Sequence, residues 1–166
     1  MSAADLQKWY LSLKPKTVVE VGSGSGSTSR LLRPIHKSYW YGIEAWAPYV
    51  TQCGLWEKYD RVIISDVRHV DFMTVCPDPD LVIIRGVLNN MERDESEVVL
   101  QKIKAWTRDL IVSIGTASEP LEGNWFEANR DKWTHDSMMG ELNEGLVKYK
   151  TGYYYHWNRR RAAGYD

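Results

Sequence analysis

One short stretch constrains the fold of this chain more than any other. A β-branched run, Thr17 to Val21, leads directly into Gly22-Ser23-Gly24-Ser25-Gly26-Ser27. Threonine and valine favour an extended strand, whereas glycines accept the backbone conformations of a tight turn. Glycines also let a bound ligand approach the main chain closely. The stretch therefore predicts a buried strand that ends in a glycine-rich, ligand-binding turn.

Strands and helices alternate along the first two thirds of the chain. We predict an amphipathic helix over Ala3 to Leu13, and a second helix that begins at a cap formed by Ser27 or Thr28 and runs to about Arg33. Further strands are predicted over 38–43, 61–65, 80–85 and 110–114, and further helices over 48–57 and 95–106. This alternation indicates an open α/β domain with a parallel sheet and right-handed crossovers.

The last third of the chain departs from this rhythm. Segment 124–142 is polar and rich in aromatic residues, and we expect it to be helical in pieces. The runs 146–150 and 153–157 alternate on either side of Thr151-Gly152, which predicts a β-hairpin. A length of 166 residues suits one domain, so we expect a single domain over 1–166.

Acidic residues accompany the ends of the first three strands. Glu20 precedes the glycines, and Glu44 and Asp66 end the second and third strands. The carboxyl ends of parallel strands converge on a ligand, and a carboxylate accepts hydrogen bonds from hydroxyl and amino groups. One such acid alone is more typical of a helix cap or a surface position. Together with the glycines, the three acids predict a nucleotide-like cofactor site.

The acidic residue before Gly-x-Gly-x-Gly, together with the two strand-end acids, resembles the cofactor half of class I S-adenosylmethionine-dependent methyltransferases. The resemblance covers the chain from about Thr17 to Ile114 and includes the fourth-strand segment Asp80 to Met91. It implies a three-layer αβα Rossmann-like sandwich with a mostly parallel sheet of about seven strands, in the order 3-2-1-4-5-7-6. The C-terminal hairpin would then supply the sixth and seventh strands, with the last strand antiparallel.

The same resemblance implies S-adenosyl-L-methionine as the cofactor. It places Glu44 at the ribose hydroxyls and Asp66 at the adenine amino group. Glu20 is expected either near the methionine end of the cofactor or as a buried structural acid that accepts from the amides of the glycine loop. Trp46 is expected either to stack on the adenine ring or to pack in the core or on the surface. The expected cofactor-binding residues are Glu20, Gly22, Ser23, Gly24, Gly26, Glu44, Ala45, Trp46, Asp66, Val67 and Arg85.

No catalytic residue is assigned, because methyl transfer from a sulfonium depends mainly on positioning and on the exclusion of water. Candidates for residues near the acceptor are Arg85, Asn89, Tyr10, His69 and His135. The acceptor is unknown and could be a metabolite, a protein side chain or RNA. Segment 122–133 is expected either to cover the acceptor or to pack as a core helix.

The charge balance and composition of the chain limit the binding partners that we expect. The 21 Lys and Arg residues nearly balance the 22 Asp and Glu residues, so any basic surface must be local. The run Arg159, Arg160 and Arg161 is either a solvated chain end, which is the more common case, or a patch that binds phosphate groups of RNA or an acidic substrate. Neither a membrane partner nor a metal site is expected, because the chain has no long apolar run and its Cys and His residues are scattered. The two distant cysteines, Cys53 and Cys76, favour a cytoplasmic location.

Two rival functions stay open. A non-catalytic S-adenosylmethionine-binding module would keep the same acids and glycines, whereas an NAD(P)-dependent oxidoreductase is disfavoured by the glycine spacing and by Asp66. The chain also lacks a large insertion for the acceptor. Three arrangements would provide an acceptor site without such an insertion: a shallow pocket, a macromolecular acceptor, or a pocket completed by a second subunit.

Overall fold

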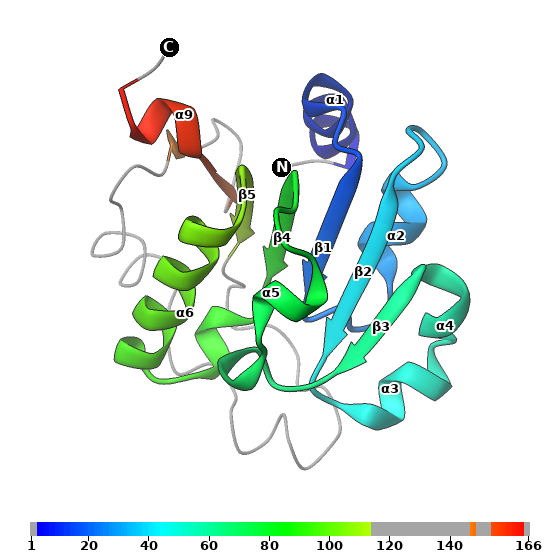
Figure 1. Ribbon diagram of the computed structural model, residues 1–166. Coiled ribbons are helices and arrows are strands. Elements are labelled where there is room, and N and C mark those ends of the chain that lie inside the picture. Colours follow the sequence, from blue (N-terminus) through cyan, green and yellow to red (C-terminus); the bar gives the residue numbers. More distant parts are fainter. Residues whose placement is uncertain (1–2, 114–146, 149–153, 165–166) are drawn as a thin grey trace.

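A seven-stranded sheet forms the centre of the molecule (Figure 1). The computed structural model describes residues 3–113, 147–148 and 154–164 of the chain. The strand order is β3-β2-β1-β4-β5-β7-β6, as predicted. Strands β1 to β5 are parallel, whereas β7 is antiparallel to both of its neighbours, β5 and β6. The strands are β1 (Thr17–Val21), β2 (Tyr39–Glu44), β3 (Arg61–Ile64), β4 (Leu81–Arg85), β5 (Asp109–Ser113), β6 (Val147–Lys148) and β7 (Tyr154–Asn158).

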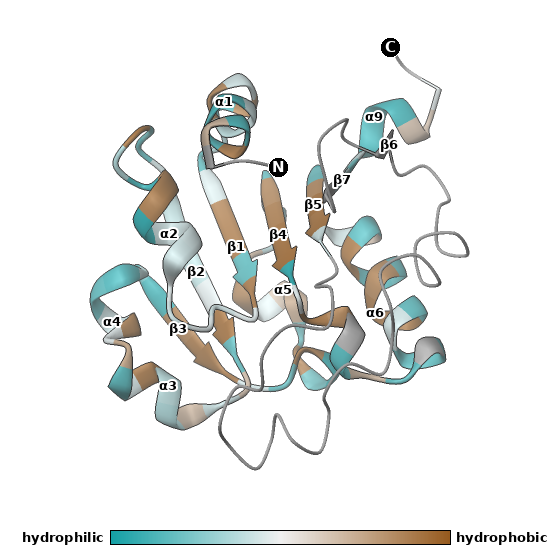
Figure 2. Ribbon diagram, turned by 180° about the vertical axis from the view of Figure 1, so that it is seen from behind, coloured by the Kyte–Doolittle hydropathy of each residue, from teal (hydrophilic) through white to brown (hydrophobic). Residues whose placement is uncertain are grey.

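Helices cover both faces of the sheet, which confirms the three layers (Figures 1 and 2). One layer contains α1 (Ala3–Leu13), α2 (Ser27–Leu32), α3 (Ala47–Gln52) and α4 (Leu55–Lys58). The other layer contains α5 (Phe72–Val75) and α6 (Arg93–Trp106). Short helices follow three of the strands: η1 (Val67–His69), η2 (Leu88–Asn90) and α9 (Arg159–Ala162).

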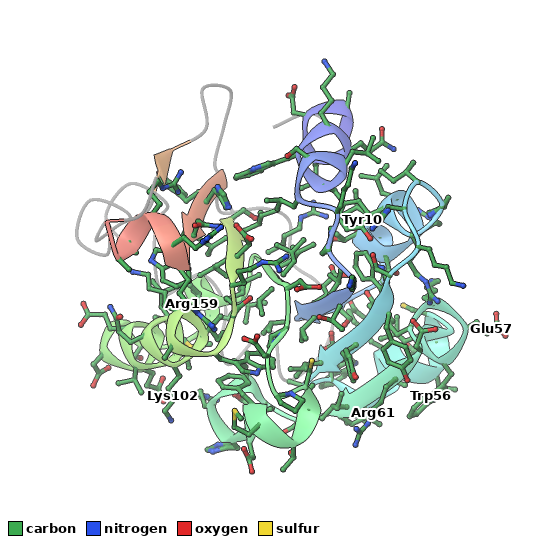
Figure 3. The ribbon with its side chains drawn as sticks, turned by 45° about the horizontal axis from the view of Figure 1, so that its top comes forward. Tyr10, Trp56, Glu57, Arg61, Lys102 and Arg159 are labelled. Carbon is green, nitrogen blue, oxygen red and sulfur yellow. The ribbon has the colours of Figure 1, made fainter. Side chains whose placement is uncertain are left out.

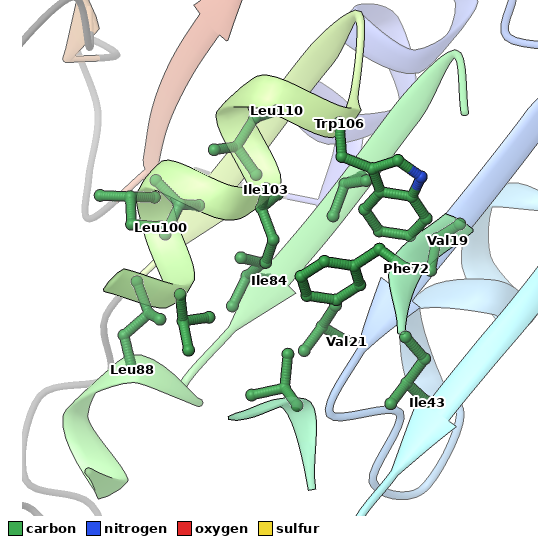
Figure 4. Packing of buried hydrophobic residues seen from close by; sticks show 14 of the residues in the cluster. Val19, Val21, Ile43, Phe72, Ile84, Leu88, Leu100, Ile103, Trp106 and Leu110 are labelled. Atoms are coloured by element: carbon green, nitrogen blue, oxygen red, sulfur yellow. The ribbon is translucent and has the colours of Figure 1, made fainter. Parts of the chain in front are cut away.

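Each face of the sheet buries its own hydrophobic cluster. In the cluster between the sheet and α6, Phe72 of α5 stacks on Trp106 of α6 with the ring centroids 4.6 Å apart. Both rings pack in the same cluster as strand residues such as Val19 and Ile84 (Figure 4). Alternate residues of the same strands, among them Val18, face the other cluster. Burial on both faces explains why the central strands read as almost continuous apolar runs.

Two helix predictions need correction. The helix predicted over 48–57 is two helices, α3 and α4, which are separated at Gly54 with a φ of +59°. The cap of α2 is Gly26, with a φ of +70°, rather than a side chain of Ser27 or Thr28. Both differences arise because a left-handed glycine turns the chain without the side-chain signal that capping rules detect.

Arg159, the first residue of the basic C-terminal run, is held against the domain. Arg159 donates hydrogen bonds to the carbonyl oxygens of Trp106 (2.8 Å) and Thr107 (3.1 Å), at the end of α6 (Figure 3). Whether this run binds nucleic acid stays a prediction. The predicted segments 122–133 and 124–142, His135 and the turn Thr151-Gly152 lie outside the described residues.

A buried carboxylate fastens β7 to β5. Asp109 accepts hydrogen bonds of 2.8 Å from both His156 and Asn158. Burial acts to raise the pKa of Asp109, but these two hydrogen bonds and the charges of His156 and Arg108 together outweigh it, so the pKa is lowered. The described helices include none that is both long and apolar enough to cross a bilayer.

Candidate functional site

A cleft of about 250 Å³ lies at the carboxyl ends of the parallel strands. Its walls come from the glycine loop after β1, the end of β2 with α3, the segment through η1, and the loop after β4. This is the edge at which open α/β sheets bind ligands. The lining residues are Val21, Gly22, Gly24, Ser25, Ile43, Glu44, Ala45, Tyr49, Ser65, Asp66, Val67, Arg68, Arg85, Gly86, Val87, Asn90 and Met91.

The structure brings most of the predicted cofactor-binding residues to this cleft. Those that line it are Gly22, Gly24, Glu44, Ala45, Asp66, Val67 and Arg85. Glu20, Ser23, Gly26 and Trp46 are not among the lining residues. In place of Trp46, which precedes α3, the aromatic residue of the wall is Tyr49, one turn into that helix.

The three glycines of the loop serve different purposes. All have positive φ, but their surroundings differ. A Cβ atom on Gly22 would overlap Val87 Cγ2, and one on Gly26 would lie 2.6 Å from Lys58 Cδ. A Cβ atom on Gly24 would meet nothing closer than the Gly22 carbonyl oxygen at 3.9 Å. A side chain at Gly22 or Gly26 would therefore displace a neighbouring side chain, whereas Gly24 leaves open space at the cleft.

Glu44 links two neighbouring segments of the cleft wall. The residue is 4% exposed, and its carboxylate accepts hydrogen bonds from the Gly24 amide (2.7 Å) and the Trp46 amide (2.9 Å). One acid thus holds the middle of the glycine loop and the start of α3. Because a carboxylate has about four acceptor sites, it keeps capacity for hydroxyl donors of a ligand.

Asp66 is held in place by Arg68, which the sequence analysis did not single out. Asp66 accepts hydrogen bonds from the Arg68 amide (2.9 Å), Nε (3.0 Å) and Nη2 (2.6 Å). Burial acts to raise the pKa of Asp66, yet these contacts outweigh it and lower the pKa. Arg68 also donates to Glu95 at the start of α6 (2.9 Å), so Asp66 is an ionised, fixed acceptor at the cleft.

Glu20 lies behind the glycine loop, not in the cleft wall. Its side chain is buried, and its Oε2 atom accepts a 2.7 Å hydrogen bond from the Tyr59 hydroxyl. Burial raises the pKa of Glu20 to about 7, against the opposing effect of hydrogen bonds from Thr28 and Tyr59. Thr28 also accepts a hydrogen bond from Arg85 (2.7 Å), which connects this buried group to the cleft.

The candidates for the acceptor side are dispersed. Tyr10 is fully buried at α1, where its hydroxyl lies 2.6 Å from Ser38 Oγ, so its assignment to the pocket is wrong. His69 is exposed on η1 and lines a neighbouring hollow rather than the cleft. Asn89 lies in η2, and its neighbour Asn90 lines the cleft and donates to the Gly86 carbonyl (2.8 Å).

Sequence reasoning missed Tyr49, Arg68 and Asn90. Arg68 carried a usable signal, because a cation two residues after a strand-end acid can fold back onto it. Tyr49 and Asn90 carried none, because their place in the wall depends on where α3 and η2 begin. Within the described residues, no group of three or more His, Cys, Asp and Glu residues could hold a metal ion.

Comparison with solved structures identifies the fold. The chain superposes on the structure of EvdMO1 with a TM-score of 0.65 at 15% identity, covering 97% of this chain and 41% of that one. A putative O-methyltransferase from Nostoc punctiforme PCC 73102 gives 0.62 at 18% identity, covering 93% and 54%. Magnesium protoporphyrin IX methyltransferase (ChlM) from Synechocystis PCC 6803, with bound S-adenosylmethionine, gives 0.59 at 16% identity, covering 93% and 75%.

This chain has the fold of S-adenosylmethionine-dependent methyltransferases. It spans only about half the length, or less, of the first two of these structures. No protein-family model and no curated protein matches the sequence.

Proposed function

We propose that this methyltransferase-fold chain binds S-adenosylmethionine in the cleft and transfers its methyl group to an acceptor that enters beside it. The observation that carries the proposal is that Glu44 and Gly24 lie side by side in the wall of one cleft. The buried Glu44 ends β2, and the neighbouring glycine loop leaves open space at its central glycine. A ligand fits this arrangement if its hydroxyl groups donate to Glu44 and its other atoms lie close to the backbone at Gly24.

The wall residues suit an adenosine group. Apolar side chains of Val21, Ile43 and Val67 offer contact area for a flat ring, and Asp66 offers an acceptor for an exocyclic amine. Because Arg68 fixes the Asp66 carboxylate by three hydrogen bonds, little conformational entropy is lost when it accepts a ligand donor. Glu44 would accept from the ribose hydroxyls.

When bound, the cofactor supplies a methyl group on a sulfonium that is already activated for transfer. The residues of this chain then orient the donor and exclude water from it. Val87 and Met91 give the wall after β4 an apolar character that restricts water. Arg85 and Asn90 bring polar groups to the same wall, where they can orient an acceptor. None of these residues is assigned as a general base.

The proposal is tested by transfer of isotopically labelled methyl groups from S-adenosylmethionine to pools of metabolites, RNA and protein. The wild-type protein should label one pool, and the Gly24→Ala variant should not, because its Cβ occupies the open space of the loop. Cofactor binding without label in any pool would favour the non-catalytic binding module. Absence of cofactor binding would refute the proposal.

A further inference from the structure

Lys58, the last residue of α4, contacts the glycine loop from the side away from the cleft. Its Nζ atom donates a 2.8 Å hydrogen bond to the Ser25 carbonyl and a second one to the Cys53 carbonyl. Its own carbonyl accepts from Arg33 Nη1 (2.6 Å), at the end of α2. Trp56 and Glu57, which precede it in α4, point outward (Figure 3). Lys58 is thus a residue of α4 whose side chain hydrogen-bonds to the loop.

The aliphatic part of Lys58 explains the third glycine. A Cβ atom on Gly26 would lie 2.6 Å from Lys58 Cδ and 3.3 Å from Leu55 Cδ2. The loop therefore lacks a side chain where the lysine stem crosses it. Gly26 serves two needs at once, since it also takes a left-handed φ of +70°.

Separate hydrogen bonds hold separate peptide units of the loop. The unit between Ser23 and Gly24 is held by Glu44, which accepts from the Gly24 amide. The unit between Ser25 and Gly26 is held at both ends, because its carbonyl accepts from Lys58 and its amide donates to the Ser23 carbonyl (2.8 Å). The unit between Gly24 and Ser25 lies between these two, and both residues line the cleft.

We propose that Lys58 is a positioning residue that holds the glycine loop in its ligand-accepting shape before the cofactor arrives. This inference rests on the proposed function, because it assigns the ligand of the loop as S-adenosylmethionine. Lys58 does not line the cleft, so its effect on the cofactor is transmitted through the Ser25 carbonyl. A loop ordered in advance costs less entropy on binding, which raises affinity without changing the reacting groups.

The test compares Lys58→Met, which keeps the stem and removes the ammonium group, with Lys58→Arg, which keeps charged donors. Lys37→Met, at an exposed lysine of the loop before β2, is the matched control. Amide hydrogen exchange is measured by NMR in the ligand-free proteins. Exchange at Gly24 and Gly26 should become about 10-fold faster in Lys58→Met, and exchange in β1 should not change.

Cofactor affinity and turnover are measured on the same proteins. The Kd and KM for S-adenosylmethionine should rise about 3- to 10-fold in Lys58→Met and recover in part in Lys58→Arg, with kcat unchanged. Unchanged loop exchange in Lys58→Met would overturn the inference, and so would faster exchange with an unchanged Kd. If the wild-type protein binds no S-adenosylmethionine, the proposed function fails, and the exchange rates alone decide whether Lys58 restrains the loop.

Discussion

Replacing Glu44 by glutamine separates the two tasks that the structure gives this acid. The carboxylate accepts from the Gly24 amide at 2.7 Å and from the Trp46 amide at 2.9 Å, and it is almost fully buried. Glutamine keeps one acceptor oxygen but turns an NH₂ group toward the other amide donor. One charge-assisted hydrogen bond is lost, which should lower the free energy of unfolding by about 1.5–3 kcal/mol.

Cofactor affinity should fall by a further, separate amount. If ribose hydroxyls donate to the Glu44 carboxylate, the loss of a charged acceptor weakens binding by about 1–3 kcal/mol, or roughly 5- to 150-fold in Kd. Urea unfolding followed by circular dichroism gives the first quantity. Titration calorimetry with S-adenosylmethionine, at a temperature where both proteins are folded, gives the second.

The control is Glu57→Gln, which makes the same charge change at an exposed site on α4 (Figure 3). It should leave the free energy of unfolding and the Kd within error of the wild-type values. A Glu44→Gln variant that binds S-adenosylmethionine as tightly as the wild-type protein would refute the assignment of Glu44 to the ribose. An unchanged free energy of unfolding would show that the hydrogen bond to Gly24 contributes no stability.

Two glycines of the loop and two buried acids should each affect stability in a different way. Gly24→Ala should lower the free energy of unfolding by only about 1–2 kcal/mol, because of its left-handed φ, yet abolish cofactor binding. Gly22→Ala should unfold more easily than Gly24→Ala, because its Cβ collides with Val87. Melting curves measure the stability of both variants, and calorimetry measures cofactor binding. Burial raises the pKa of Glu20 from 4.5 to about 7, so the folded state binds a proton more tightly and stability falls as the pH rises from 4.5 to 7, by about 3 kcal/mol in total. Glu20→Gln should therefore match the wild-type protein near pH 4 and exceed its stability near pH 8 in urea titrations; lower stability near pH 8 would contradict this. Asp109→Ala should have a free energy of unfolding about 3–5 kcal/mol below that of the wild-type protein at neutral pH. Because the pKa of Asp109 is lowered on folding, this difference from the wild-type protein should shrink in unfolding measurements below about pH 4.

The sheet was predictable because its signals are local. Val18, Val19 and the apolar run of β4 mark buried strands, and glycines or acids mark their ends. Strand order followed from the resemblance and from the right-handed crossovers of parallel sheets. The break at Gly54 was not predictable, since nothing in the sequence distinguishes a glycine tolerated within a helix from one that adopts a left-handed turn.

The cleft was predictable to the extent that strand ends define it. Glu44 and Asp66 lie where a strand-end acid must lie in a parallel sheet. The buried position of Glu20 depends on Tyr59, 39 residues away along the chain, and on Gly42, where a Cβ atom would lie 2.9 Å from the tyrosine ring. Contacts of this kind arise from packing between elements, which residue spacing does not encode.

Titration calorimetry of the wild-type protein with S-adenosylmethionine, S-adenosylhomocysteine and NAD in parallel tests the central claim most directly. The cleft geometry predicts binding of the first two ligands and none of NAD. Binding of NAD alone would contradict the account and favour an oxidoreductase, and binding of none of the three would show that this cleft does not serve an adenosine cofactor.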